Sequence, residues 1–181
     1  MQFKISALAI AAFLLSAGCA TKLAPPPDSQ TIQQRKPTDA ATVYVYRPHV
    51  DFAHRVGVYV SANGKRIVNL KDASFTITYW KPGLYHIAGE ADVTASTWKL
   101  PEGDIEISGT GTYYIELERN IEMETHNEMN MMFINGMVIP VFTPVSSVVS
   151  SDEHWVVKEE SAAKAQIAKL GYVEPISKDA P

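Results

Sequence analysis

The residues best suited to bind a metal gather in one stretch of the chain. Met129, Met131 and Met132 follow His126 within six positions. Thioether and imidazole groups are ligands that suit Cu(I). No M-x-x-M repeat is sustained, however, and an apolar run continues beyond the methionines, which favours methionines that fill a core or a contact surface. We therefore expect no metal and no other cofactor, and these four residues are the Cu(I) candidates if a metal does bind.

No sequence pattern of a catalytic site accompanies these residues. The five histidines show neither H-E-x-x-H nor any other paired-ligand spacing. A G-x-S-x-G elbow is absent from the sequence, and Gly109-Thr110-Gly111 lacks the lysine of a phosphate-binding loop. We therefore expect a protein that is not an enzyme.

The single cysteine, Cys19, follows a short apolar segment. Lys4 supplies a positive charge, and residues 5–15 are uncharged and mostly apolar. This run is shorter than the roughly 20 residues that a membrane-spanning helix needs. A positive start, a short apolar run and small residues before a cleavage site are typical of a secretory signal peptide. We assign residues 1–18 to that peptide.

The junction Leu15-Ser16-Ala17-Gly18-Cys19 resembles the lipobox of bacterial lipoproteins. The resemblance implies cleavage between Gly18 and Cys19 and acylation of Cys19, with chains such as palmitate. Two or more acyl chains hold a protein to a membrane far more firmly than one. Residue 20 is Ala rather than Asp, which by the same resemblance implies the cell outer membrane. We expect a lipid-anchored protein there, facing the periplasm.

The charge balance limits the possible partners. Cleavage removes one basic residue, which leaves 16 − 1 = 15 basic and 20 acidic residues. A chain with this mild negative charge lacks the basic face that nucleic acid requires. With Cys19 acylated no thiol remains for a disulfide, so burial must stabilise the fold. We expect the membrane and an envelope protein as partners and no nucleic acid, and the oligomeric state stays open.

The chain divides by composition into four parts. After the signal peptide, residues 19–40 are polar and rich in proline and glutamine, which is typical of a flexible tether carrying the lipidated cysteine. Residues 41–174 carry the folded domain. Residues 175–181 are expected to form a disordered tail.

The folded part has the pattern of short β-strands. Residues 42–47 are rich in β-branched and aromatic residues, and Asn63-Gly64 separates two similar runs, which predicts a hairpin. Pro82-Gly83 predicts a type II turn. Residues 159–170 form the one predicted helix. These features predict an antiparallel β-sandwich of about seven strands with one C-terminal helix. Glu116 is placed on a solvated face, and the predicted core consists of Val43, Val45, Val58, Val60, Ile77, Ile115, Leu117 and Ile167.

Several of these elements together resemble one family of bacterial lipoproteins, known as domain of unknown function 2846. The likeness covers about residues 41–170 and rests on Tyr44, Tyr46, Arg47, Pro48, Gly64, Pro82, Gly83, Tyr113 and Tyr114. It implies a lipid anchor and a small β domain in which these residues are structural. It supplies no catalytic residue and no ligand. Arg47 is expected to be a strand-end residue with a carboxylate partner.

Two further features leave alternatives open. Residues 129–151 contain no charged side chain. Their β-branched residues favour a strand pair buried in the sandwich, and the alternative is an exposed contact surface. Aromatic residues are also frequent, and they are expected to pack inside the sheets, with a glycan-binding platform as the alternative: Tyr44, Tyr46, Tyr59, Tyr79, Trp80, Tyr85, Trp98 and Tyr114. We expect an anchored, non-enzymatic β domain that binds or supports another envelope component; the alternative is a ligand-binding module for Cu(I) or glycan.

Overall fold

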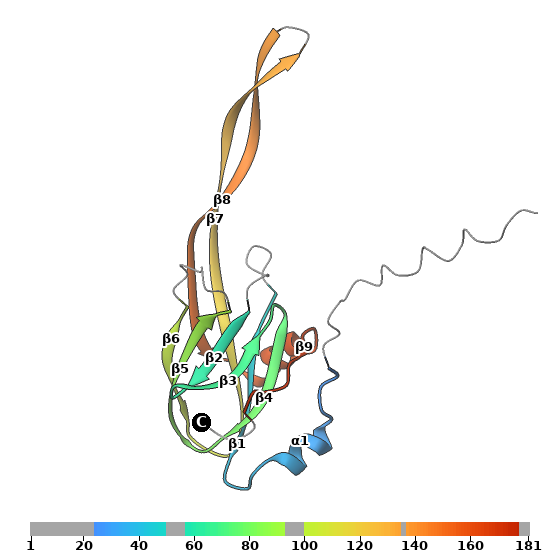
Figure 1. Cartoon of the computed structure of the whole chain (residues 1–181), viewed down its shortest axis with the longest axis vertical. Coiled ribbons are helices and arrows are strands. Elements are labelled where there is room, and N and C mark those ends of the chain that lie inside the picture. Colours follow the sequence, from blue (N-terminus) through green and yellow to red (C-terminus); the bar gives the residue numbers. More distant parts are fainter. Residues whose placement is uncertain (1–23, 50–56, 93–99, 135–136, 178–181) are drawn as a thin grey trace, which may run out of the picture.

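A computed structural model describes residues 24–49, 57–92, 100–134 and 137–177. The described chain is mainly β and forms a sandwich of two sheets, as predicted (Figure 1). Cys19, Gly18, Trp98 and the segment 178–181 lie outside the described residues. Within the described ranges, no helix has the length and apolar character needed to span a bilayer.

Nine described strands make up the two sheets. The first sheet has the order β8-β7-β1-β4-β9 and consists of β8 (Met137–Val157), β7 (Thr112–Ile134), β1 (Ala41–Arg47), β4 (Ser74–Trp80) and β9 (Gly171–Tyr172). The second has the order β3-β2-β5-β6 and consists of β3 (Lys65–Leu70), β2 (Val58–Ala62), β5 (Gly83–Ala91) and β6 (Glu102–Ile107). The predicted antiparallel pairing holds except at β1–β7 and β4–β9, which are parallel.

The main core lies between the two sheets. Trp80, Ile67, Ile87 and Ile115 are all fully buried there. Seven of the eight predicted core residues are buried. Six of them lie in this main core, namely Val43, Val45, Val58, Val60, Ile115 and Leu117. The seventh, Ile77, is buried on the outer face of the first sheet. The eighth, Ile167, is partly buried on the other side of the first sheet.

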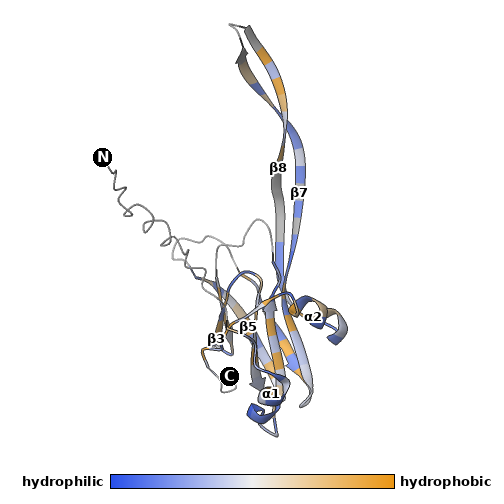
Figure 2. Ribbon diagram, turned by 90° about the vertical axis from the view of Figure 1, so that its right-hand side faces the viewer, coloured by the Kyte–Doolittle hydropathy of each residue, from blue (hydrophilic) through white to orange (hydrophobic). Residues whose placement is uncertain are grey.

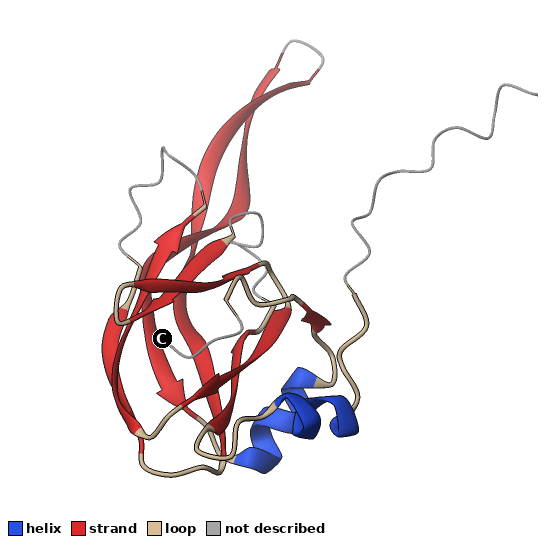
Figure 3. Cartoon of the chain, turned by 60° about the horizontal axis from the view of Figure 1, so that its bottom comes forward, coloured by secondary structure: helices blue, strands red, loops and turns tan. Residues whose placement is uncertain are grey.

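A second apolar cluster covers the outer face of the first sheet. Phe75, Tyr114 and Tyr172 are buried there beneath the helices α1 (Ser29–Arg35) and α2 (Glu160–Ile167), which lie on one side of the sandwich (Figure 3). Because this face is covered, the prediction of a solvated Glu116 is wrong. The Glu116 side chain is only 6% exposed.

Residues 24–40 form part of the folded domain rather than of a flexible tether. Asp28 caps α1 by accepting a 2.7 Å hydrogen bond from the Thr31 N–H. Ile32 packs on the second cluster, and its carbonyl accepts a bond from Tyr79 Oη. Ala24 forms a bridge with Tyr172. One well-placed apolar residue docks this polar segment, and composition does not reveal that.

The predicted tail also starts in contact with the domain. The Ile176 N–H donates a 2.8 Å hydrogen bond to the carbonyl of Ile67. Residues 175–177 are therefore attached to the sandwich, and the expectation of a disordered tail is corrected for this part.

The two predicted turns have different outcomes. Asn63 (φ 50°) and Gly64 (φ 78°) both have the positive φ that a type I′ hairpin turn requires, so the β2–β3 hairpin is confirmed. In the described part of the chain, Gly64 is the glycine with a positive φ. Gly83 therefore does not form a type II turn. Instead, Pro82 lies in the short link that carries the chain from β4 in one sheet to β5 in the other.

Candidate functional site

Strands β7 and β8 run far past the sandwich as a two-stranded hairpin (Figure 1). β1 pairs with β7 only as far as Tyr46↔Glu116, whereas β8 follows β7 to the pair Ile134↔Met137. We call residues 120–134 of β7 together with residues 137–152 of β8 the arm. Its fourteen residue steps along β7, at about 3.3 Å each, give a length of about 45 Å.

The uncharged segment forms the outer part of this arm, and the prediction that it is buried inside the sandwich is wrong. Met129 is 57% exposed, Met131 56% and Phe142 64%. The residues nevertheless form strands, as predicted, because residues 129–134 pair with 137–142. Among the described strands no second layer faces them, because the four-stranded sheet ends where the arm begins (Figure 2).

The last six residue pairs, residues 129–134 with 137–142, form what we call the arm end. Residues directly opposite in an antiparallel pair share a face. One face carries Met129 with Phe142, and the opposite face carries Met132 with Ile139. A ribbon on a protein surface normally has one polar face. The arm end is apolar on both faces, so it can bury surface against a partner on either side.

A buried charge network holds the arm where it leaves the sheet. Arg119 on β7 forms an ion pair with Glu153 on β8, and both side chains are at most 10% exposed. Burial, with the nearby charge of Arg47, lowers the pKa of Arg119. Burial lowers the pKa of Arg47, which is 3% exposed, and the negative charge of Asp72 acts in the opposite direction. A strand-end Arg47 with a carboxylate nearby agrees with the sequence interpretation.

The Cu(I) candidates are not brought together. Strand alternation places Met129 and Met131 on one face of β7 and Met132 with His126 on the other. Along that second face, His126 and Met132 are six residues apart, which is about 20 Å. His126 instead lies 3.5 Å from Glu128. In the part of the chain that is described, no three His, Cys, Asp or Glu residues converge on a possible metal position.

The aromatic residues mostly pack within the fold rather than forming a platform. Tyr44 stacks on Tyr114 with ring centroids 5.0 Å apart, and Trp80 packs against Tyr85 at 4.8 Å. The guanidinium of Arg66 covers the ring of Tyr59. Most of the aromatic residues that were candidates for a glycan-binding platform therefore make packing contacts within the sheets.

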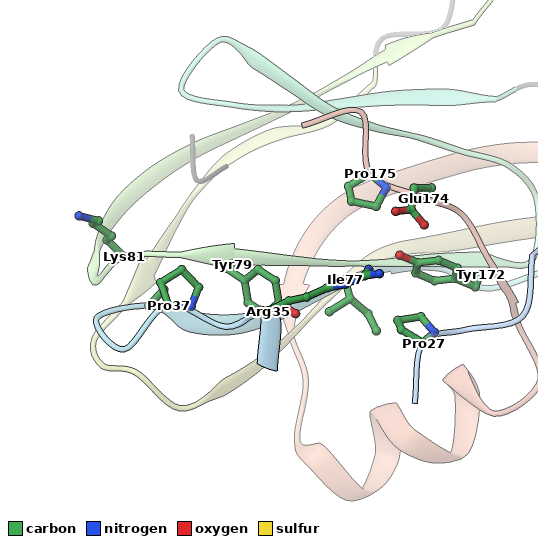
Figure 4. A pocket seen from close by; sticks show the side chains of 10 residues that line it. Pro27, Arg35, Pro37, Ile77, Tyr79, Lys81, Tyr172, Glu174 and Pro175 are labelled. Carbon is green, nitrogen blue, oxygen red and sulfur yellow. The ribbon is translucent and has the colours of Figure 1, made fainter. Parts of the chain in front are cut away.

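One pocket of about 570 Å³ lies where the segment 24–40 crosses β4 and β9. Tyr79 and Tyr172 form part of its wall, and Arg35 reaches along it toward Tyr172 and Glu174 (Figure 4). Lys81 at its border pairs with Asp39 at 2.9 Å. The remaining wall is mainly apolar, and its residues are Pro27, Pro37, Ala40, Ile77 and Pro175. This volume and lining are typical of a small-molecule pocket.

The remaining residues on which the family resemblance rests lie in the strands and turns of the sandwich. Tyr113 accepts a hydrogen bond at its hydroxyl from the Gly109 N–H, and this bond closes the turn before β7. Tyr46 is fully buried, and Pro48 directly follows β1. None of these residues lies in the arm.

Searches of protein-family models, curated proteins and solved structures each give no match. The likeness to the lipoprotein family therefore stays a resemblance.

The sequence contains one signal for the arm that the composition argument missed. Asn135-Gly136 separates two long runs without any other Gly, and Asn-Gly is the same hairpin signal as Asn63-Gly64. Counting outward from this dipeptide predicts the observed pairs from Ile134↔Met137 to Met123↔Val148, and the register shifts by one residue beyond them.

Proposed function

We propose that this protein is a lipid-anchored lipoprotein of the bacterial envelope whose arm binds another envelope component. The observation that carries the proposal is the arm end: an uncharged ribbon, apolar on both faces, exposed about 30 to 45 Å along the arm from the sandwich. Large exposed apolar patches on soluble domains usually mark interaction sites. The lipobox-like sequence at Cys19 supports the anchor.

The position of the N-terminal segment on the sandwich also favours the arm as the part that contacts a distant component. Ala24 is bridged to Tyr172, and only five residue steps separate Ala24 from Cys19. Five steps of extended chain span at most about 18 Å. An acylated Cys19 would thus hold the sandwich close to its membrane, and contact with a distant component would fall to the arm.

In-cell crosslinking tests the contact directly. A photoreactive phenylalanine analogue replaces Phe142 at the arm end, and in a matched protein it replaces Leu84, which is equally exposed (66%) but lies on the sandwich. We expect adducts with an envelope component from position 142 and none from position 84. Equal labelling from both positions, or none from position 142, would contradict the proposal.

The pocket supports a second candidate function, which is the binding of a glycan fragment. Its tyrosines offer ring faces, and the Arg35 guanidinium offers N–H donors. Titration with a soluble peptidoglycan fragment tests this candidate. Arg35→Ala should weaken binding, whereas Lys169→Ala, an exposed change just after α2 and outside the pocket lining, should not.

A further inference from the structure

The outer edge of β8 is closed to strand pairing by two prolines. Pro140 pairs with Met131 and Pro144 pairs with Asn127. A proline has no N–H, so these pairs occupy positions where the two strands do not exchange hydrogen bonds. The N–H that would point outward from β8 is therefore missing at both places. Prolines in such positions are a known protection of exposed sheet edges.

The outer edge of β7 has no such protection. Because Met131 and Asn127 lie opposite the prolines, their N–H and C=O groups point away from β8, toward this edge. β7 contains no proline over its whole length. Beyond Glu116, none of the described strands pairs with β7 on this side. A two-stranded ribbon is only marginally stable in water by itself, and a third strand would stabilise it.

We propose that the open edge of β7 pairs with the same edge of a second copy of this chain. The two β7 strands run antiparallel about a twofold axis at Asn127, and the two arms join into a four-stranded ribbon of order β8-β7-β7-β8. A twofold contact is self-complementary, as this edge requires. The pairing uses the strand edge rather than the apolar faces, so it goes beyond the proposed envelope contact and does not depend on it.

Hydrogen-bond geometry restricts the axis to a residue, and charge favours Asn127 over its two neighbours, His126 and Glu128. N–H groups that face the edge belong to alternate residues, so the axis must fall on a residue and not between two. An axis at Asn127 places His126 of each copy opposite Glu128 of the other, which brings an imidazole N–H to a carboxylate twice. An axis at Glu128 places this carboxylate opposite its own copy. An axis at His126 places Glu124 opposite Glu128. Both alternatives set like charges against each other, which is destabilising.

Crosslinking of the full-length protein in detergent tests the proposed register. Asn127→Cys places a thiol next to its own copy at the axis, so a short bis-maleimide should double the monomer mass. Thr143→Cys, on the protected strand β8, should stay at the monomer mass, and the parent protein serves as the blank for Cys19. An adduct of any other mass from Asn127→Cys would show a different partner on this edge and overturn the proposal.

A proline placed on β7 tests the edge itself. Met129→Pro removes an N–H that faces the open edge and leaves the pairing with β8 intact, as Pro140 and Pro144 do on β8. We expect the dissociation constant of the dimer to rise at least tenfold in sedimentation equilibrium, with an unchanged circular dichroism spectrum. Pro144→Thr, the matched change on β8, should leave the dimer intact. A monomeric parent protein, or a Met129→Pro protein as dimeric as its parent, would overturn the proposal.

A charge swap tests the contact between His126 and Glu128. Glu128→Lys should weaken the dimer because it sets two cations against two histidines. The double change His126→Glu with Glu128→His restores the complementary pairs and should restore dimerisation. A double variant as weak as Glu128→Lys would contradict an axis at Asn127.

Discussion

Tyr46 on β1 donates a 2.8 Å hydrogen bond from its hydroxyl to Oε2 of Glu116 on β7, and both side chains are buried. Lys158 Nζ lies 3.9 Å from the same carboxylate oxygen. Burial first, and the bond to Glu116 second, raise the pKa of Tyr46 well above its usual value. This pair links β1 to the strand that continues into the arm, so it fastens the arm to the sheet from the helix-covered side.

Glu116→Ala is expected to destabilise the domain. It leaves the Tyr46 hydroxyl buried without its acceptor, which typically costs about 1–3 kcal/mol. Urea unfolding measures the change, with Glu124→Ala on the exposed arm as the control that should cost almost nothing. Tyr46→Phe combined with Glu116→Ala should cost less than the two single changes added together. A Glu116→Ala protein as stable as the control would contradict the buried bond.

The domain is expected to lose stability in alkaline solution. Burial raises the pKa values of Tyr44, Tyr79, Tyr85, Tyr114 and Tyr172, in the last case to about 12. The phenols therefore stay neutral in the folded state at a pH where the unfolded chain, with tyrosine pKa values near 10, already releases protons. This stability is fully present below pH 10 and is lost as the pH rises toward 12. Urea midpoints measured from pH 8 to 12 should fall, and the decline should be shallower for Tyr172→Phe.

The ion pair at the base of the arm gives a third prediction. Glu153→Ala leaves Arg119 buried without this partner and close to the positive Arg47. Removing one member of a buried pair typically costs about 3–5 kcal/mol. The hydrogen exchange rate of the backbone amides near Arg119 on β7 and near Glu153 on β8 should also rise. Lys164→Ala breaks the exposed pair with Glu160 on α2 and should cost less than about 0.5 kcal/mol. Equal costs for the two changes would argue against a buried network.

The sequence allowed the sandwich and its core to be predicted because local signals and tertiary packing agree there. Val43 and Val45 lie on the face of β1 that packs in the main core, as the alternation of the strand predicts. Asn63 and Gly64 have the positive φ values that these residue types predict. The pattern did not reveal that both faces of the first sheet are covered. Glu116 alternates as a solvated residue would, yet Tyr46, Lys158 and the helices enclose it.

The candidate site could be predicted only in part, for a related reason. The uncharged residues around Met131 and Val141 indicate strands, and an exposed contact surface is the alternative to burial that the sequence leaves open. Hydrophobic periodicity shows which residues form a strand, but it does not show whether a second sheet extends far enough to cover them. The arm extends beyond the sandwich because β7 and β8 are far longer than their neighbours in the sheet, β1 and β4. Likewise, α1 depends on the docking of Ile32, which only the tertiary structure reveals.

The lipid anchor gives a fourth prediction. Cys19→Ala removes the acylated thiol that the lipobox-like sequence implies, and inhibition of the lipoprotein signal peptidase by globomycin blocks the same step. Either treatment should leave an unprocessed or mislocalised precursor in cell fractions. Thr21→Ala, two residues beyond the junction, should mature normally. A Cys19→Ala protein that still matured and sedimented with outer membranes would exclude this anchor.

The last prediction separates the arm from the core by a single charge. Val141 lies in the arm end opposite Asn130, in a ribbon without a covering layer, so the carboxylate of Val141→Asp can stay hydrated. Its effect on the free energy of unfolding should stay within about 0.5 kcal/mol, as for most surface changes. Ile115→Ala, which empties a fully buried position on the same strand pair, should cost about 2–5 kcal/mol. The crosslinks from position 142 should nevertheless disappear in Val141→Asp and persist in Ala165→Asp, which adds the same charge on α2. Urea unfolding and crosslinking on the same preparations decide the matter: if Val141→Asp unfolds as readily as Ile115→Ala, the arm end is packed against the protein and is not a contact surface.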